Sequence, residues 1–230
     1  MNKINNIKLF LQSLAGLLFL FAVMSACLFL PQMSFQYSLA WIYLTVFFIP
    51  VIIITIYIFI KDKNLLKSRL AVGVVAEKRY FQKIIQGLAG IFFISIYIVS
   101  AFDYKLGWTV VPLWLCCVAD IISLLSFVFL FFVFKQNSFL SATIEIQSQQ
   151  KVISTGLYGI VRHPMYLFAS LLLLFTPLAL GSFCGLIFSI SGIILIYFRA
   201  IDEEKELITS LEGYNDYCKK VKYRLIPFIL

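Results

Sequence analysis

The chain has 230 residues, of which 62% are hydrophobic and 13% are charged, and its mean hydropathy is +0.97. Soluble domains carry about a quarter charged residues, so this composition excludes an ordinary soluble protein and indicates an integral membrane protein. The net charge of +8 is explained by basic loops beside anionic lipid, and no nucleic acid is expected as a partner.

Four apolar runs are each long enough, at about 1.5 Å per residue, to cross a hydrocarbon core of about 30 Å. They lie near residues 9–30, 39–60, 84–102 and 109–134. Lys3 and Lys8 precede the first run, which contains Cys27 in a setting similar to a lipoprotein signal. Because the run continues through Leu30, a first membrane helix is the favoured interpretation.

A fifth apolar stretch, residues 165–198, would extend about 51 Å as a single helix, well beyond the thickness of a bilayer. It is interrupted by Pro177 and by the small residues Gly181 and Ser182. We therefore predict a helical hairpin there. The predicted fold class is all-α, a polytopic membrane protein with about six transmembrane helices, the last two forming the hairpin, plus a cytoplasmic C-terminal tail.

Charge placement supports this arrangement because positive residues concentrate in cytoplasmic loops. With six spans and both termini cytoplasmic, Lys105 is the only one of the 19 Lys and Arg residues that falls on the opposite side. We expect a multi-pass protein of the cytoplasmic (inner) membrane. Residues 61–83 mix basic side chains with Leu65, Leu66, Leu70, Val74 and Val75, a pattern expected of a helix at the headgroup level. A loop that sets the topology is the favoured interpretation of this segment, and a substrate-specific role is the alternative.

Two classes of site are disfavoured. The five Cys residues are odd in number and mostly fall in predicted spans, so no disulfide framework is expected. A single His and the absence of a Cys-x-x-Cys pair argue against a metal site. Asp120 lies near the middle of the fourth span, where a carboxylate is costly. We predict a hydrogen bond from Asp120 to a neighbouring helix, with a functional role as the alternative.

Residues 156–166 read Gly-Leu-Tyr-Gly-Ile-Val-Arg-His-Pro-Met-Tyr and form a polar segment just before an apolar run. Gly156 and Gly159 permit the tight loop, and Pro164 suits the first turn of a helix. Arg162 and His163 would then lie at the helix N-terminus, where free backbone N–H groups favour anions. The alternatives are a lipid anchor for Arg162 and a helix cap for His163.

A second charged cluster follows the predicted hairpin and returns to the same membrane face. Arg199 and Glu203 are spaced i,i+4 and can share one helix face. An interfacial Arg followed by a solvated acidic turn is the simpler interpretation. Four acidic residues within positions 202–206, beside a negative leaflet, fit a cationic ligand or Arg and Lys partners better. The basic, aromatic tail from Gly213 onward would dock at the interface.

The segments Gly-Leu-Tyr-x-x-Val-Arg-His-Pro-Met-Tyr, Arg-x-x-x-Glu-Glu-x-x-Leu, Gly-Tyr-x-x-Tyr and Arg-Leu-Ile-Pro-Phe flank the predicted hairpin. Together they resemble the isoprenylcysteine carboxyl methyltransferase family and its phospholipid methyltransferase relatives. The resemblance covers roughly residues 135–230. It implies that residues 1–134 contribute transmembrane helices and residues 135–230 the cofactor-binding region, all within one structural domain. It also implies S-adenosyl-L-methionine as the methyl donor.

The resemblance further implies which residues form the site. Arg199 would face the methyl acceptor, Arg162 and His163 would suit the carboxylate of the donor, and Glu203 would accept from its ribose or ammonium. The implied cofactor shell is Lys151, Val152, Ile153, Tyr158, His163, Pro164, Met165, Tyr166 and Glu203. The spacing before Tyr214 and Tyr217 and the residues around Thr143 depart from the family pattern.

The expected reaction is carboxyl O-methylation of a lipid-like or prenylated acceptor that enters from the membrane. A carboxylate acceptor is already ionised and can pair with Arg199 without a general base. An amine acceptor, as in phospholipid N-methylation, must lose a proton, and Glu204 or His163 would then be the candidate base. The rival interpretation is an NADPH-dependent reductase of the sterol reductase type. Met165 counts against it, because those enzymes typically carry Asn at this position. A transporter is disfavoured because Asp120 alone makes no polar pathway.

Overall fold

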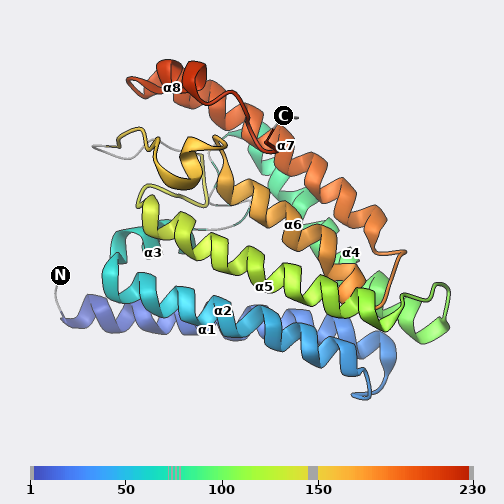
Figure 1. The fold of residues 1–230 in the computed structure, drawn as a ribbon. Coiled ribbons are helices and arrows are strands. Elements are labelled where there is room, and N and C mark those ends of the chain that lie inside the picture. The colour runs from blue at the N-terminus through green and yellow to red at the C-terminus, as the bar shows by residue number, and fades with distance from the viewer. Residues whose placement is uncertain are drawn as a thin grey trace.

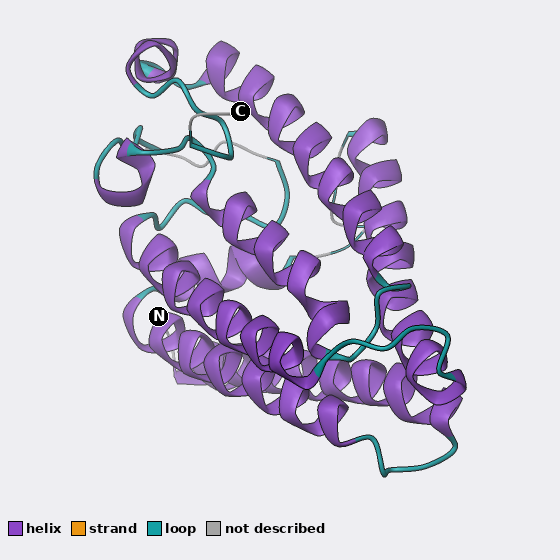
Figure 2. Ribbon diagram, turned by 45° about the vertical axis from the view of Figure 1, so that its right-hand side comes forward, coloured by secondary structure: helices purple, strands orange, loops and turns teal. Residues whose placement is uncertain are grey.

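The computed structural model describes residues 3–71, 73, 75, 77, 79–144 and 150–227, and these residues form helices without a strand. Figure 1 shows the long helices lying side by side. The connections 33–37, 107–112 and 180–185 gather at one end of the molecule, and the short helices gather at the other. In Figure 2 the same helices are joined by loops alone over the described residues. The helices are α1 (Lys3–Gln32), α2 (Ser38–Lys61), α3 (Lys63–Leu70), α4 (Tyr80–Leu106), α5 (Leu113–Gln136), the short 3-10 helix η1 (Gly156–Gly159), α6 (Pro164–Ala179), α7 (Leu186–Ser210) and α8 (Tyr214–Lys220).

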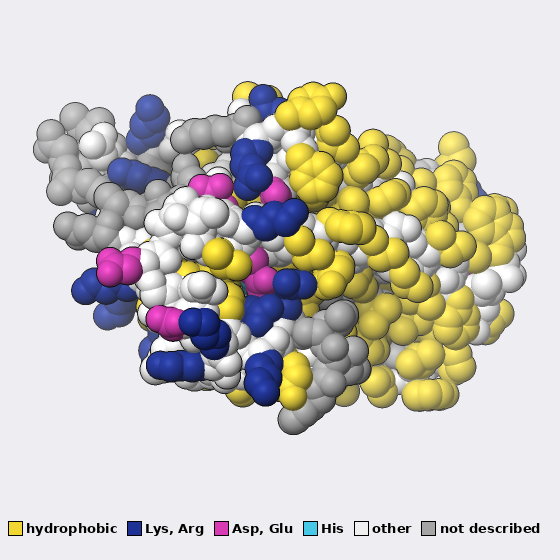
Figure 3. All heavy atoms as spheres, turned by 90° about the horizontal axis from the view of Figure 1, so that it is seen from above, with side chains coloured by type: hydrophobic (Ala, Val, Ile, Leu, Met, Phe, Trp, Pro, Cys, Tyr) yellow, Lys and Arg dark blue, Asp and Glu magenta, His cyan; other side chains and the backbone are white. Residues whose placement is uncertain are grey.

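Four helices, namely α1, α2, α4 and α5, are long and apolar enough to cross a membrane, which confirms the four predicted spans of this multi-pass chain. Large apolar side chains on them face outward, among them Phe19, Ile53 and Ile121. Exposed apolar surface on this scale suits a lipid environment. Viewed from above, the hydrophobic side chains cover one side of the molecule and the charged side chains gather on the other (Figure 3).

The fifth apolar stretch divides into two helices near the expected place. α6 ends at Ala179, just after Pro177, and α7 begins at Leu186. α6 has 16 residues, about 24 Å of helix, and α7 becomes charged from Arg199 onward. The count of six transmembrane helices and a hairpin that crosses the membrane therefore stay predictions. α6 packs against α5 and α7, and α7 packs against α4.

Small residues allow the helices to approach closely. Ala40 of α2, Ala101 of α4 and Ala119 of α5 are fully buried in one cluster with the ring of Tyr97. The hydroxyl of Tyr37 in this cluster donates to the carbonyl oxygen of Leu180. Membrane helices associate through such close packing and interhelical hydrogen bonds.

A buried carboxylate that the sequence did not single out joins α4 to the connection between α6 and α7. Asp103 accepts hydrogen bonds from the backbone N–H and hydroxyl of Thr109 (2.7 and 2.6 Å), from the hydroxyl of Ser182 (2.6 Å) and from the backbone N–H of Cys184 (3.2 Å). Its side chain is fully buried. These four donors fix the end of the α6–α7 pair opposite the predicted site.

Asp120 behaves differently from our expectation. Its Oδ1 atom is buried and has no hydrogen-bond partner within the described ranges. Oδ1 therefore does not make the hydrogen bond to a neighbouring helix that we predicted for Asp120. Asp120 lies on α5, one residue after the fully buried Ala119, where two helix backbones pack closely.

The amphipathic segment after α2 forms the short helix α3. The carboxylate of Asp62 caps it by accepting from the backbone N–H of Leu65 (3.0 Å). Leu65 and Leu66 are buried, which is the pattern expected of a helix whose apolar side faces the core. Val74, which belongs to the segment predicted to be amphipathic, lies outside the described residues.

Candidate functional site

The glycine-rich loop before α6 is built around η1. Gly156 has φ +59°, and a Cβ there would lie 2.4 Å from the side-chain nitrogen of Gln136. The side-chain oxygen of Gln136 accepts from the backbone N–H of Leu157 at 3.2 Å. The carbonyl oxygen of Tyr158 accepts from the hydroxyl of Tyr217 at 2.7 Å. The loop is thus held between the end of α5 and α8.

The start of α6 has the predicted proline, and the backbone before it is bound to the C-terminal tail. Pro164 is the first residue of α6, and His163 precedes it without a side-chain cap. The backbone N–H groups of Arg162 and His163 donate to the carbonyl oxygens of Tyr223 and Arg224, both at 2.9 Å. The C-terminal tail therefore occupies these two N–H groups, and the predicted anion site at the first turn of α6 stays a prediction.

Glu204 is the centre of a buried ion cluster. Its Oε1 atom accepts from Arg162 Nε at 2.7 Å and lies 3.2 Å from His163 Nε2, and its Oε2 atom accepts from Arg224 Nε at 2.7 Å. Burial tends to raise the pKa of Glu204, but the hydrogen bonds from His163, Arg162 and Arg224 prevail and lower it to about 2. A carboxylate with such a pKa is a poor base at neutral pH, so the geometry favours a structural role for Glu204.

Arg162 is similarly engaged. Besides Glu204, its Nη1 atom donates to the carbonyl oxygens of Val221 (2.8 Å) and Lys222 (2.9 Å). Hydrogen bonding and charge from Glu204 outweigh the effect of burial and raise the pKa of Arg162. Arg162, His163 and Glu204 thus come together at one place, as the predicted return of the chain to the same face requires. This place ties the tail to α6 and α7.

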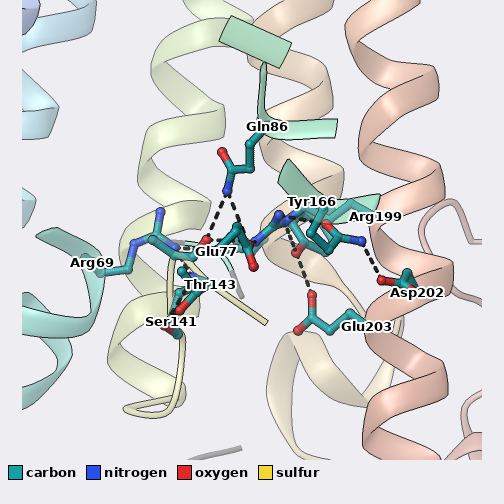
Figure 4. Close-up of polar contacts among 12 residues, drawn as sticks. Arg69, Glu77, Gln86, Ser141, Thr143, Tyr166, Arg199, Asp202 and Glu203 are labelled. Carbon is teal, nitrogen blue, oxygen red and sulfur yellow. Dashed lines mark hydrogen bonds and ion pairs between the residues drawn. The ribbon is translucent and has the colours of Figure 1, made fainter. Parts of the chain in front are cut away.

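Tyr166 connects the two predicted halves of the site. Its hydroxyl donates to Oε2 of Glu203 at 2.5 Å and accepts from Nε of Arg199 at 3.1 Å. The prediction that Arg199 and Glu203 share one face of a helix is confirmed by this shared partner. Figure 4 shows Tyr166 against Arg199 and Glu203 at the end of α7.

The guanidinium of Arg199 is held by several groups in addition to Tyr166. Nη1 donates to the side-chain oxygen of Gln82 at 2.9 Å, and Nη2 donates to Oε1 of Glu77 at 2.9 Å and to the carbonyl oxygen of Ala142 at 2.7 Å. Glu77 is buried, with 2% of its surface exposed. Arg199 therefore already holds one carboxylate of its own chain.

A cavity lies on the other side of Tyr166, between the loop, the start of α6 and the charged end of α7. It encloses about 810 Å³, counting its open mouth. All nine residues of the predicted cofactor shell line it, together with Arg162. Arg199 and Glu204 are not among its lining residues. The lining residues beyond the predicted shell include Asn137, Thr143, Glu206, Leu207, Leu211, Tyr214 and Tyr217.

The aromatic side chains give this cavity a face suited to a cationic ligand. Burial raises the pKa of Tyr158 and Tyr214, so both hydroxyls stay neutral donors. The hydroxyl of Tyr214 is buried and has no hydrogen-bond partner among the residues that the structure describes. Across the described ranges no group of His, Cys, Asp and Glu side chains is arranged to hold a metal ion.

Sequence reasoning missed the residues that the α3–α4 connection and α4 contribute to this region. Glu77 and Gln82 bind Arg199, and Gln82 also donates to the buried carboxylate of Asp202 at 2.6 Å. One signal was present, since Glu77 is the only acidic residue between positions 63 and 102. A lone carboxylate among basic neighbours could have been paired with a distant arginine.

The fold defines a polytopic helical membrane protein with a cavity at one end of the bundle. Residues 106–211 match the family model described as phospholipid methyltransferase. The predicted resemblance to the methyltransferase family is thus confirmed over this region. The chain is also similar to Delta(14)-sterol reductase TM7SF2 of Mus musculus, with 32% identity over 94 residues that cover 38% of this chain and 22% of the relative. The match therefore spans about a fifth of the length of that curated relative.

Proposed function

We propose that this protein is an integral-membrane methyltransferase that uses S-adenosyl-L-methionine to methylate a lipid-like acceptor. The observation that carries the proposal is the cavity, because the nine residues selected from the family motifs all line it although they come from positions 151 to 203. The match of residues 106–211 to the phospholipid methyltransferase family supports the same reaction class. In this proposal the site faces the cytoplasm, both termini are cytoplasmic, and residues 135–230 supply the cofactor-binding region.

The lining residues fit the charges of this methyl donor. Glu203, held by Tyr166, can accept from ribose hydroxyls or an ammonium, and the rings of Tyr158, Tyr214 and Tyr217 can pack against an adenine or a sulfonium. Lys151 is exposed at the rim and can pair with a carboxylate. When bound, the donor supplies an electrophilic methyl group. The protein then needs to align donor and acceptor and to exclude water, without a covalent nucleophile.

The acceptor chemistry depends on Arg199. A carboxylate acceptor, the expected substrate of O-methylation, would have to displace Glu77 from the guanidinium, since Glu77, Gln82 and Ala142 occupy its two terminal nitrogens. An amine acceptor needs no such displacement. The family motifs imply the carboxylate of a prenylated acceptor, whereas the Glu77–Arg199 pair favours a phospholipid amine.

The proposal is tested by ligand stabilisation and by transfer of a labelled methyl group. S-adenosylhomocysteine should raise the Tm of the detergent-solubilised protein, because a ligand that binds the folded state stabilises it by mass action. Incubation with labelled S-adenosylmethionine and membrane lipids should label the lipid fraction. A protein that is not stabilised by S-adenosylhomocysteine, and that transfers no label, refutes the proposed function.

The similarity to a sterol reductase supports one rival, an NADPH-dependent membrane reductase. The same assay separates the two, since a reductase should be stabilised by NADPH and not by S-adenosylhomocysteine. Met165, which lines the cavity, stands where the reductases typically carry Asn. Stabilisation by NADPH alone would replace the methyltransferase proposal with this one.

The role of Arg199 requires a paired experiment. Arg199→Ala alone would leave the buried carboxylate of Glu77 without its partner, which destabilises the fold. The double variant Arg199→Ala with Glu77→Gln removes both charges together. If Arg199 orients the acceptor, the double variant should retain stabilisation by S-adenosylhomocysteine and lose transfer, whereas Glu77→Gln alone should retain transfer. An active double variant contradicts the proposed role of Arg199.

A further inference from the structure

Arg69 stands apart from the other arginines of this chain. The other four each contact a carboxylate: Arg79 contacts Asp202, Arg162 and Arg224 contact Glu204, and Arg199 contacts Glu77. Within the described ranges, Arg69 forms no ion pair with a carboxylate. It is the arginine whose charge has no carboxylate partner in the described part of the chain.

Three neighbours nevertheless hold the Arg69 guanidinium in place. Its Nη1 atom donates to the carbonyl oxygen of Ser141 at 3.1 Å and lies 3.7 Å from the sulfur of Met165. Its Cζ atom lies 5.4 Å from the centre of the Phe134 ring. Figure 4 shows the side chain pointing from α3 toward Ser141 and Glu77. The guanidinium group is therefore oriented through Nη1, and its contacts to the described residues leave Nε and Nη2 for a ligand.

Two carboxylates near Arg69 already have partners within the chain. Glu77 is bound to Arg199 at 2.9 Å, and Glu203 accepts from Tyr166 at 2.5 Å. Burial lowers the pKa of Arg69, and the like charge of Arg199 acts in the same direction. A guanidinium stays protonated at neutral pH despite such a shift. A partly buried cation without a direct counter-ion is costly, so an anionic partner at this position stabilises the protein.

The position of Arg69 relates this charge to the reaction. Met165, which Arg69 contacts, lines the cavity assigned to the methyl donor. α3 carries buried Leu65 and Leu66 on one side and the exposed Lys67 on another, a pattern suited to the membrane surface. A ligand bound to Arg69 would thus lie at headgroup level, one side chain away from the donor.

We propose that Arg69 binds the phosphate of the acceptor lipid and so gives the enzyme a preference for phospholipids over acceptors that lack a phosphate. The inference rests on the proposed function where it calls this lipid the methyl acceptor. The binding of a lipid phosphate by Arg69 does not depend on that function. The planar guanidinium fork matches the oxygens of a phosphate bidentately, which a point charge does not. Arg69 acts here as a binding residue and takes no part in the transfer of the methyl group.

The test compares two short-chain lipids that differ in the phosphate headgroup. Dihexanoyl phosphatidylethanolamine and dihexanoylglycerol are titrated into the detergent-solubilised protein, and the Kd is measured for each. Arg69→Gln should raise the Kd for the phospholipid about 10- to 100-fold, as expected for the loss of charge-assisted hydrogen bonds. It should change the Kd for dihexanoylglycerol by less than about twofold, because that lipid offers no anion to the guanidinium.

Two variants serve as controls. Lys61→Gln removes the same charge from an exposed position at the end of α2 and should leave both Kd values within about twofold, as expected for a solvated surface charge. Arg69→Lys keeps the charge but not the fork and should raise the phospholipid Kd by about three- to tenfold. It also keeps the proposal testable if Arg69→Gln does not fold. In turnover assays Arg69→Gln should raise KM for the phospholipid and leave kcat within about threefold.

Three results would overturn the proposal. The first is an unchanged phospholipid Kd in folded Arg69→Gln and Arg69→Lys. The second is a loss of stabilisation by S-adenosylhomocysteine in Arg69→Gln with lipid binding retained, which would assign Arg69 to the donor. The third is stabilisation of the wild-type protein by millimolar inorganic phosphate that equals that of the phospholipid, which would assign the site to free phosphate. If S-adenosylhomocysteine fails to stabilise the wild-type protein, the proposed function fails, while the comparison of the two lipids still decides the role of Arg69.

Discussion

Replacement of Glu204 by Gln tests whether this residue holds the C-terminal tail or acts in the chemistry. Its carboxylate contacts Arg162, His163 and Arg224 at 2.7 to 3.2 Å, and its side chain is 5% exposed. The pKa falls from an ordinary 4.5 to about 2. At about 1.36 kcal/mol per pKa unit, this shift corresponds to a stabilisation of about 3 kcal/mol.

The sign of the pH dependence follows from the direction of that shift. Because the folded-state pKa is below the unfolded-state value, the unfolded state binds the proton more readily. The contribution of Glu204 is complete above about pH 4.5 and is lost as the pH falls toward about 2. Glu204→Gln removes this contribution at neutral pH as well. With about 2 to 4 °C of Tm per kcal/mol for a chain of this size, we expect a Tm lower by about 6 to 12 °C.

The assay is thermal unfolding in detergent as a function of pH, together with hydrogen exchange of residues 221–227. Loss of the cluster should release the tail, because Arg162 also binds the carbonyl oxygens of Val221 and Lys222. Glu212→Gln, at an exposed position, is the matched control and should leave both measurements unchanged. A Glu204→Gln variant with the Tm, pH profile and exchange rates of the wild type would refute the reasoning.

Three further outcomes are expected from the same structure. Asp103→Asn should lower the free energy of unfolding by about 2 to 4 kcal/mol, since an amide cannot accept from all four donors. Asp120→Asn should leave the Tm within about 1 °C of the wild-type value. Equal losses of Tm in the two variants would contradict this contrast. Gly156→Ala should cost about 1 to 2 kcal/mol for the positive φ, besides the clash with the side chain already filling that space, and is checked by Tm and by the Kd for S-adenosylhomocysteine. Glu203→Gln should raise the Kd for S-adenosylhomocysteine about tenfold with little change in Tm. An unchanged Kd in calorimetry would remove Glu203 from the cofactor shell.

Much of the fold could be predicted because the bilayer imposes a simple rule of length and hydropathy. The four long helices follow directly from apolar runs of 19 to 26 residues. The break between α6 and α7 follows from Pro177 and Gly181, since Gly181 has a φ of +76° that other residues rarely adopt. The burial of Asp103 could not be predicted, because two of its donor residues, Ser182 and Cys184, lie 79 and 81 positions further along the chain.

The sequence predicted which residues line the site better than it predicted how those residues pair with one another. The family motifs selected nine residues, and all nine line one cavity. We also expected Arg162 to suit the donor carboxylate and Glu204 to be a candidate base for an amine acceptor, whereas the structure joins both in a buried ion cluster with Arg224. A motif shows which polar residues occur together along the chain. It does not show which of their donors and acceptors are already paired with one another.

The sequence by itself determined that the chain is an all-helical membrane protein, where its long apolar helices lie, and which polar residues belong to one site. Local hydropathy and turn-forming residues are sufficient for the first two conclusions, whereas the third also needs the resemblance to the methyltransferase family. Only the tertiary structure decided that Glu77 binds Arg199, that the tail covers the backbone N–H groups before α6, and that Arg69 lacks a carboxylate in the described part of the chain. Those pairings join residues up to 122 positions apart, so they depend on how the helices pack and have no signature in local sequence.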